Sequence, residues 1–247
     1  SIRGQEDVPV SGNPQYSYYL KNFARQESFE YLFTDNSLDT IVQGRTPTYG
    51  DEIAFRVPRR GDLLSKIYLK IVLPPTYLYS NLLRNKTDSF NLYSIIEHVE
   101  LIIGGQLIQR LTGEYILNYI NLYYSGNDLE FFKNSSEMTI RDLKKNYASF
   151  GQFVLLPIPF YFSTRKGMEL PLIAITKQNI VVNIKLAPRP PISGIPELQD
   201  VTVSTEYILL DNKTTKKELS RNGLVYRVEQ VQMTSEVFDR DKEVVSM

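Results

Sequence analysis

Hydrophobic and polar residues alternate one by one in several segments of this chain. The clearest case is 66–73, where every second residue is isoleucine or leucine. The same period of two recurs in 52–57, 179–186 and 201–207, and 224–233 is similarly rich in strand-forming residues. A period of two places successive side chains on opposite faces of a strand. One apolar face and one polar face are typical of antiparallel sheets, so the chain is predicted to be an antiparallel β protein.

Glycine and proline mark the ends of these segments. Gly104 and Gly105 stand between two strand-like runs. Two adjacent glycines permit the positive φ angles that a type I′ turn needs at both positions, so the two runs are predicted to form a β-hairpin. Pro74 and Pro75 end the segment that precedes this hairpin. The prolines of 188–196 predict a stiff loop between two strands.

Helical patterning is sparse. Apolar residues at i, i+3, i+4 and i+7 from Ile116 onward predict a helix over 114–124. Shorter helices are predicted over 138–147 and 214–221. Strands at this spacing, with helices confined to the loops, predict an all-β fold, an eight-stranded antiparallel jelly-roll sandwich with short helices in the loops.

Composition limits the class of protein. The 247 residues are 42% hydrophobic and 23% charged, which is typical of a globular chain with a sizeable core. Basic and acidic residues both number 28, so the net charge of zero gives no reason to expect direct binding of nucleic acid. The absence of cysteine excludes disulfides and cysteine-based zinc sites. No apolar run approaches the roughly 20 residues that a membrane helix needs.

No constellation of residues predicts catalysis, a cofactor or a metal site. The one histidine, His98, lies in a strand-like run and away from any Gly-x-Ser-x-Gly turn, which favours a structural role over a Ser-His-Asp site. A glycosidase needs two carboxylates that converge across a cleft. Glu27 with Glu30 and Glu97 with Glu100 are the pairs to check, and solvated strand faces are the favoured interpretation. We therefore predict no enzyme activity.

Two short motifs have both a functional and a structural interpretation. Arg60-Gly61-Asp62 spells an integrin-binding tripeptide, but Gly-Asp before a strand is also ordinary turn chemistry, and the turn is favoured. Asn85, Asn134 and Asn212 begin glycosylation sequons. Their use requires a secretory signal, and the first residues of this sequence contain no signal-peptide core.

Five motifs occur along the chain in the order found in one protein family. The most specific is Val-Glu-Leu-Ile-Ile-Gly-Gly-Gln at 99–106, which includes Gly104 and Gly105. The others are Gly12-Asn13-Pro14-Gln15 with the tyrosines after it, the turn Gly61-Asp62 before a strand, the passage 157–174 with Pro171, and the strand 206–211. Together they resemble the major capsid protein of large nucleocytoplasmic DNA viruses of eukaryotes, the double jelly-roll family.

The resemblance implies a structural role in a virion capsid that is assembled in the host cytoplasm. Family members form homotrimeric, pseudo-hexagonal capsomers that tile an icosahedral shell above an internal membrane. The implied partners are further copies of the protein, neighbouring capsomers and minor capsid proteins, without membrane insertion. The expected domains are an N-terminal arm (1–28), the first jelly roll (29–211) and a connector that begins a second jelly roll (212–247), the remainder of which is absent.

Three alternatives remain beside this interpretation. They are a transient assembly scaffold, a single-jelly-roll vertex protein of the same lineage, and a carbohydrate-binding β-sandwich. The first two share the same fold and the same motifs, so the sequence does not separate them from a capsid subunit.

Loops are expected to carry the contacts between subunits, because connecting segments tolerate variation on a fixed scaffold. The three candidate loops are 76–88, 124–136 and 188–199. Four tyrosines in or beside them are possible interface residues, since tyrosine is enriched at interfaces. They are Tyr77, Tyr79, Tyr123 and Tyr124, and packing within the loop is the alternative for each.

Overall fold

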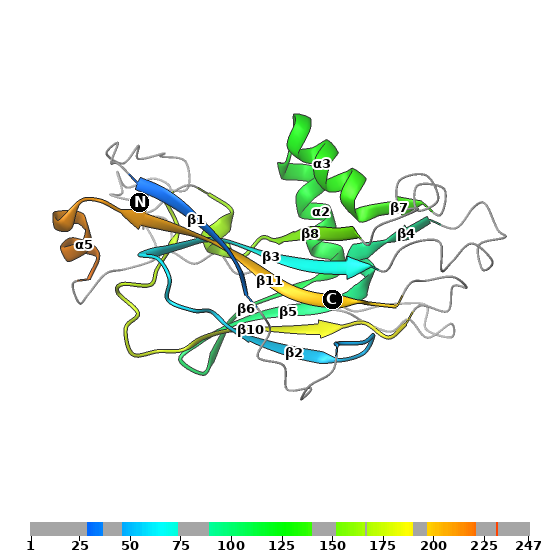
Figure 1. Cartoon of the computed structure of the whole chain (residues 1–247), viewed down its shortest axis with the longest axis horizontal. Coiled ribbons are helices and arrows are strands. Elements are labelled where there is room, and N and C mark those ends of the chain that lie inside the picture. The colour runs from blue at the N-terminus through cyan, green and yellow to red at the C-terminus, as the bar shows by residue number, and fades with distance from the viewer. Residues whose placement is uncertain are drawn as a thin grey trace, which may run out of the picture.

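Two antiparallel sheets face each other and form a sandwich (Figure 1). The computed structural model describes residues 29–36, 46–73, 89–139, 152–165, 167–189, 197–220 and 231. Sheet A contains, in spatial order, β1 (Phe29–Asn36), β11 (Asp200–Leu210), β3 (Leu63–Leu73) and β8 (Gln152–Ile158), with the short β9 (Leu170–Pro171) beside one end of β3. Sheet B contains β2 (Glu52–Arg56), β10 (Ile180–Leu186), β5 (Ile96–Ile103) and β6 (Gln106–Thr112).

The order of the strands is that of a jelly roll. When β9 is left aside, the two sheets contain eight strands in the described part of the chain. In chain order the first pairs with the eighth, the second with the seventh, the third with the sixth and the fourth with the fifth. This pattern arises when one long hairpin folds over into two sheets. The predicted all-β class and eight-stranded jelly-roll sandwich are therefore confirmed.

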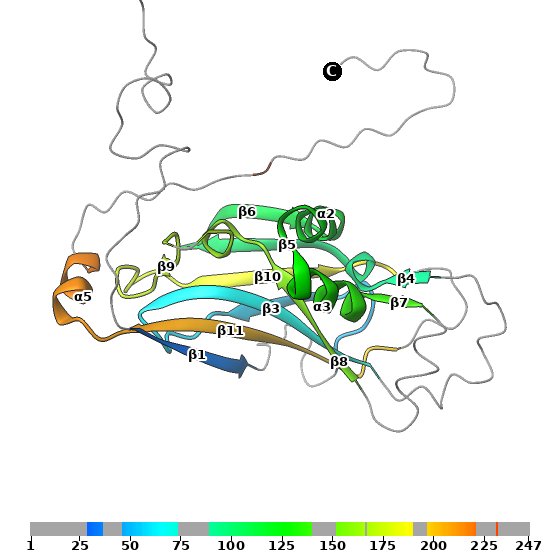
Figure 2. The same cartoon turned by 90° about the horizontal axis from the view of Figure 1, so that it is seen from above.

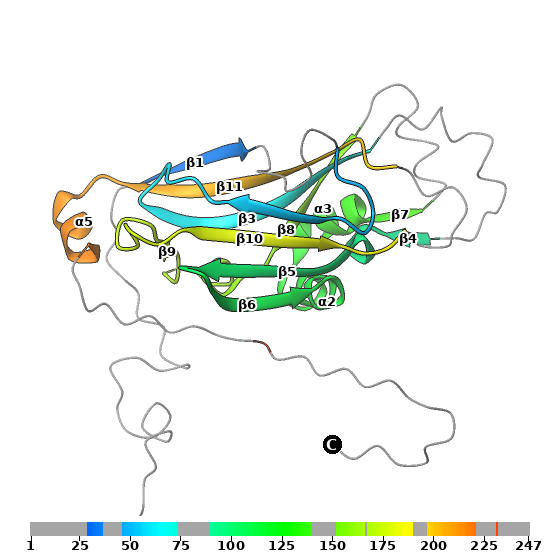
Figure 3. The ribbon, with the colours of Figure 1, turned by 90° about the horizontal axis from the view of Figure 1, so that it is seen from below.

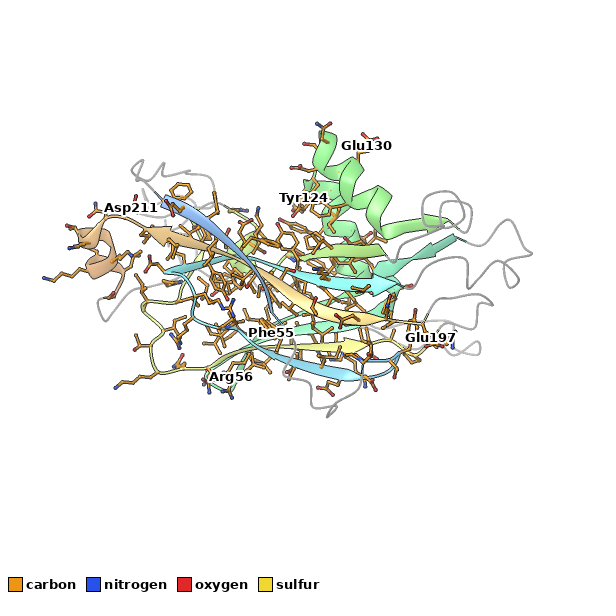
Figure 4. All side chains as sticks on the ribbon, viewed as in Figure 1. Phe55, Arg56, Tyr124, Glu130, Glu197 and Asp211 are labelled. Carbon is orange, nitrogen blue, oxygen red and sulfur yellow. The ribbon has the colours of Figure 1, made fainter. Side chains whose placement is uncertain are left out.

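The alternating residues form the core between the sheets. Along β10, Ile180, Val182, Ile184 and Leu186 are at most 2% exposed, whereas each residue between them is partly exposed. The same alternation in β2 places Phe55 inside the sandwich and Arg56 on its outer side (Figure 4). Burying one face of each strand removes apolar surface from water and is the main stabilising contribution to the fold.

The predicted hairpin joins β5 to β6. Ile103 pairs with Gln106, and only Gly104 and Gly105 lie between them. Their φ angles are +61° and +83°, as a type I′ turn requires. Gly104 also donates its N–H to the carbonyl oxygen of Asn179 at 2.9 Å, so the turn contacts the chain that leads into β10. The hairpin prediction is confirmed.

Two predicted helices are confirmed with ends that differ by one or two residues. Helix α2 (Gly113–Tyr123) is capped by Thr112, whose hydroxyl oxygen accepts a hydrogen bond from the N–H of Tyr115. Helix α5 (Lys213–Leu219) follows β11. The described residues also contain two 3-10 turns, which are η2 (Leu92–Ile95) and η3 (Tyr161–Ser163).

One predicted loop is wrong, and one predicted helix does not begin where it was expected. Most of the segment 124–136, expected to be a loop, is helix α3 (Gly126–Ser136), whose Leu129 and Phe132 pack against the core. The helix predicted over 138–147 does not begin there, because β7 (Glu137–Thr139) pairs with β4 (Ser89–Asn91). In both places contacts with residues distant in sequence override the local spacing.

Several predicted segments lie outside the described residues. These are the loop 76–88, the greater part of 138–147, the middle of the loop 188–199, and the run 224–233 apart from Val231.

Valine at position 104 is expected to destabilise the sandwich. A β-branched residue is strained at a φ of +61°, and a Cβ atom there would lie 3.1 Å from the Cδ atom of Gln178. We expect Gly104→Val to cost about 1–3 kcal/mol, which lowers the melting temperature by roughly 2–4 °C per kcal/mol. Gly104→Asn is the control, because asparagine tolerates the left-handed conformation. Equal melting temperatures for the parent and Gly104→Val would contradict the expected strain.

Candidate interaction surfaces

The turn at Gly61 and Asp62 joins three parts of the fold at one end of the sandwich. The N–H of Asp62 donates to the carbonyl oxygen of Ile208 at 3.0 Å, and its own carbonyl oxygen accepts from the N–H of Ile173 at 3.2 Å. Its carboxylate atom Oδ2 accepts from the N–H of Leu210 at 2.8 Å. One residue thus connects the start of β3, the end of β11 and the segment after β9.

Gly61 is required by the close approach of this turn to β11. A Cβ atom at Gly61 would lie 2.5 Å from the Cβ atom of Tyr207. The ring of Tyr207 is fully buried, its hydroxyl donates to the carbonyl oxygen of Pro58 at 2.7 Å, and burial raises its pKa. The carboxylate of Asp62 is engaged and its side chain is only 14% exposed. The structure therefore supports the turn and not the integrin-type interpretation of Arg60-Gly61-Asp62.

Strand β1 presents aromatic side chains to solvent, a feature that the sequence analysis missed. Phe29, Tyr31 and Phe33 are 48%, 58% and 51% exposed, and they occupy alternate positions of one strand. The rings of Phe29 and Tyr31 meet edge to face with centroids 5.2 Å apart. The centroid of Phe33 is 6.0 Å from that of Tyr68 on β3. Exposed apolar patches are common where proteins contact one another, so this cluster is a candidate interaction surface. We name these three residues of β1 the β1 patch.

The β1 patch is on an edge strand. In sheet A, β1 pairs with β11 and stands at the end of the strand order. An edge strand without protection is a site where another chain can pack. Alternating aromatic residues in 29–33 are visible in the sequence, but such a pattern normally predicts the buried face of a strand. Only the strand order shows that this face has no covering layer among the described residues.

A second exposed apolar cluster lies at the end of α2. Leu122 and Tyr123 are 78% and 71% exposed. The rings of Tyr119 and Tyr123 stack with centroids 4.5 Å apart, and Tyr115 lies 6.2 Å beyond Tyr119. Burial, followed by the neighbouring tyrosines, raises the pKa of Tyr119 to about 12. Tyr115 and Tyr119 are partly buried, whereas Leu122 and Tyr123, here named the α2 patch, are open to contact.

The neighbouring residue Tyr124 has a different environment. Its ring meets that of Phe132 edge to face at 5.0 Å, and it lies between α3 and the sheet, whereas Glu130 points outward (Figure 4). Burial, and then the charge of Asp128, raises the pKa of Tyr124. These contacts favour the loop-packing alternative for Tyr124.

The remaining candidate residues are distributed between described and undescribed parts of the chain. Pro171 is buried in β9 opposite Leu63. Five others lie outside the described residues, and they are Gly12, Asn13, Pro14, Tyr77 and Tyr79.

The two apolar patches belong to elements that lie apart in the fold. Figure 2 shows β1 along the outer side of sheet A, and α2 beside β6 on the opposite side of the sandwich. Figure 3, from the other side, shows the same separation. The described residues thus form two unlike exposed apolar clusters, one on a strand and one at a helix end.

The polar residues of sheet B interact with one another. Arg110 donates from its Nε atom to Glu100 at 2.9 Å and from its Nη2 atom to the Nε2 atom of His98 at 3.2 Å. The Nδ1 atom of His98 lies 3.5 Å from a carboxylate oxygen of Glu97. The described residues include no cluster of three or more potential metal ligands from His, Cys, Asp and Glu. Nor does any helix among them have the length and apolar character to span a membrane.

A family model and two curated relatives match most of this chain. Residues 17–219 match the family model described as the major capsid protein N-terminus. The major capsid protein of Pyramimonas orientalis virus is 22% identical over 94% of this chain and 57% of its own length. That of Paramecium bursaria Chlorella virus 1 is 23% identical over 94% of this chain and 51% of its length. The chain thus spans about half the length of these curated relatives.

Solved structures share the fold. The capsid chain of the PBCV-1 quasi-atomic model superposes with a TM-score of 0.67 at 19% identity, over 87% of this chain and 50% of its own. The Faustovirus major capsid protein gives a TM-score of 0.50 at 10% identity, over 87% of this chain and 59% of its own. At these identities the likeness concerns the jelly roll alone.

Gly61→Ala tests the close approach of the turn to β11. The added methyl group has no room beside Tyr207, so the start of β3 must shift and disturb the hydrogen bonds of Asp62. We expect a loss of about 1–3 kcal/mol, measured by urea unfolding. Arg60→Ala, at the exposed neighbouring position, is expected to remain within about 0.5 kcal/mol of the parent. Equal unfolding midpoints for the two variants would refute the steric argument.

Proposed function

The chain belongs to the major capsid protein family, in the part that forms its N-terminus, and we propose that it builds the shell of a large DNA virus. The observation that carries this proposal is the jelly roll, in which β1 pairs with β11, β2 with β10, β3 with β8 and β5 with β6. The match of this chain to the family covers residues 17–219. Its curated relatives are named major capsid proteins. The proposed role is structural and uses no catalytic residue.

We further propose that the native protein forms trimeric, pseudo-hexagonal capsomers that tile an icosahedral shell, assembled in the host cytoplasm. In this proposal residues 1–28 are an arm, 29–211 are the first jelly roll, and 212–247 lead into a second one. The partners are further copies of the protein, neighbouring capsomers and minor capsid proteins. This chain spans 57% and 51% of the length of two curated relatives, which is consistent with a second jelly roll in the remainder.

The two apolar patches support a cyclic assembly. In a ring of three subunits each interface joins two different surfaces, one from each neighbour. The β1 patch and the α2 patch are different surfaces, and they belong to two elements that Figure 2 shows on opposite sides of the sandwich. Two different patches favour a head-to-tail ring over a two-fold dimer, in which one surface meets its own copy. We propose that the β1 patch of one subunit packs near the α2 patch of the next.

Sedimentation of the native full-length protein tests the proposed capsomer. We expect a trimer as the principal species at micromolar concentration. A protein that remains strictly monomeric at every concentration would refute the capsomer and favour one of the other roles.

Substitutions in the patches test the proposed interface in the same full-length protein. Tyr31→Ser with Phe33→Ser, and separately Leu122→Ser with Tyr123→Ser, should each raise the dissociation constant of the trimer by at least about tenfold, because aromatic residues carry much of the energy of an interface. All four side chains are at least half exposed, so the fold and its circular dichroism spectrum should be retained.

Leu107→Ser is the matched control for these variants. Leu107 is 54% exposed, but it lies on β6 next to the hairpin and in neither patch. Trimers that dissociate to the same extent in this control and in the patch variants would contradict the proposed interface, while the capsomer itself would stand.

A further inference from the structure

Helix α5 lies beyond the end of the sandwich at which β1 begins (Figures 1 and 3). It starts only two residues after β11 ends, so it is the first element that the chain forms on leaving the jelly roll. Its position relative to the sheets therefore determines the direction in which the polypeptide continues.

This helix is too short to be stable by itself. It has seven residues, and isolated helices shorter than roughly 12 residues are marginal in water. Its ends are capped locally, since the side chain of Asn212 accepts from the N–H of Thr214 at 2.8 Å and the N–H of Ser220 donates to Lys216 at 3.0 Å. Caps contribute only about 1 kcal/mol each, so contacts with the sandwich are needed to hold the helix in place.

The described side chains of α5 provide few such contacts. Lys216 and Leu219 are partly buried, and the other described side chains of the helix are exposed. The Nζ atom of Lys216 lies 2.8 Å from the Oδ2 atom of Asp62, the same oxygen that accepts from the N–H of Leu210. An ion pair at hydrogen-bond distance to a carboxylate that is only 14% exposed is screened less by solvent than a fully exposed pair.

Asp62 is well suited to hold this helix because its own position is fixed. Its main chain is hydrogen-bonded to β11 and to the segment after β9, and Gly61 allows the turn to approach β11 closely. The carboxylate therefore needs no reordering when it binds the lysine. A preorganised acceptor of this kind lowers the entropic cost of the contact.

We propose that the Asp62–Lys216 contact holds α5 folded against the jelly roll and fixes the direction in which the chain leaves it. When the contact is broken, α5 unfolds locally while the sandwich stays intact. The contact belongs to the chain itself. Its use in a capsomer, to orient the part of the protein that follows, rests on the proposed function.

Hydrogen exchange of the full chain tests the folded state of α5. In Lys216→Met, peptides covering 213–220 should exchange about three to ten times faster than in the parent, because a hydrogen-bonded ion pair is lost. Peptides from β11 should exchange at the parental rate. Lys217→Met is the matched control, because Lys217 is the exposed neighbouring lysine of the same helix and methionine has a similar helix propensity. Equal exchange in the two variants would overturn the proposal.

Two further variants separate the ion pair from general packing. Asp62→Asn retains an oxygen that can accept from the N–H of Leu210 but removes the charge that binds Lys216, so α5 should exchange as fast as in Lys216→Met. Lys216→Arg retains the charge and should restore slow exchange. An α5 that stays protected in Asp62→Asn would show that Leu219 or the caps hold the helix instead.

A distance measurement tests the direction of the chain. The sequence contains no cysteine, so Lys177→Cys and Glu218→Cys, both at exposed positions, provide unique sites for two spin labels. The distance distribution should be narrow in the labelled parent and in Lys217→Met, and broad in Lys216→Met. A narrow distribution in Lys216→Met would overturn the directional role, while the proposed capsomer would stand.

Discussion

The ladder between β3 and β11 is the contact on which the rest of the structure depends. It places the two central strands of sheet A side by side, and residues such as Ser65 and Glu206, which are 141 positions apart, become hydrogen-bonded. Strands β1 and β8 attach to the two outer edges of this pair. Since so much chain must close into a loop before the pair forms, the ladder is costly in entropy and sheet A is stable only as a unit.

The sequence was most informative where a structure is set by neighbouring residues. Ile180 to Leu186 alternate because one face of β10 is buried and the other is not, and that difference is present in the residues themselves. Gly104 and Gly105 predicted their turn because few other residues adopt positive φ at two successive positions. The pairing of strands is not encoded in this way. The jelly roll was predicted instead from the number and spacing of the strand-like runs and from the order of the family motifs.

What the sequence did not predict depends on contacts between distant segments. Tyr123 and Tyr124 are adjacent, yet Tyr123 is exposed and Tyr124 packs against Phe132, because α3 folds back over one of them. The aromatic residues of β1 have the pattern of a buried face, yet they lie on the outer face of an edge strand, since Leu32 between them packs against the core. Gly61 and Asp62 were identified as a turn, but the partners of Asp62 lie on β11 and α5.

The pairing of β1 with β11 also decides where the chain enters and leaves the jelly roll. Phe29 pairs with Leu210, so the chain enters and leaves the jelly roll at the same end, where Asp62 contacts both β11 and α5. This end therefore serves the connection along the polypeptide. Tyr31 and Phe33 of the β1 patch lie further along β1, and the α2 patch lies at the end of a helix that Figure 2 shows beside β6. The contact that holds α5 and most of the exposed aromatic surface therefore use different parts of the jelly roll.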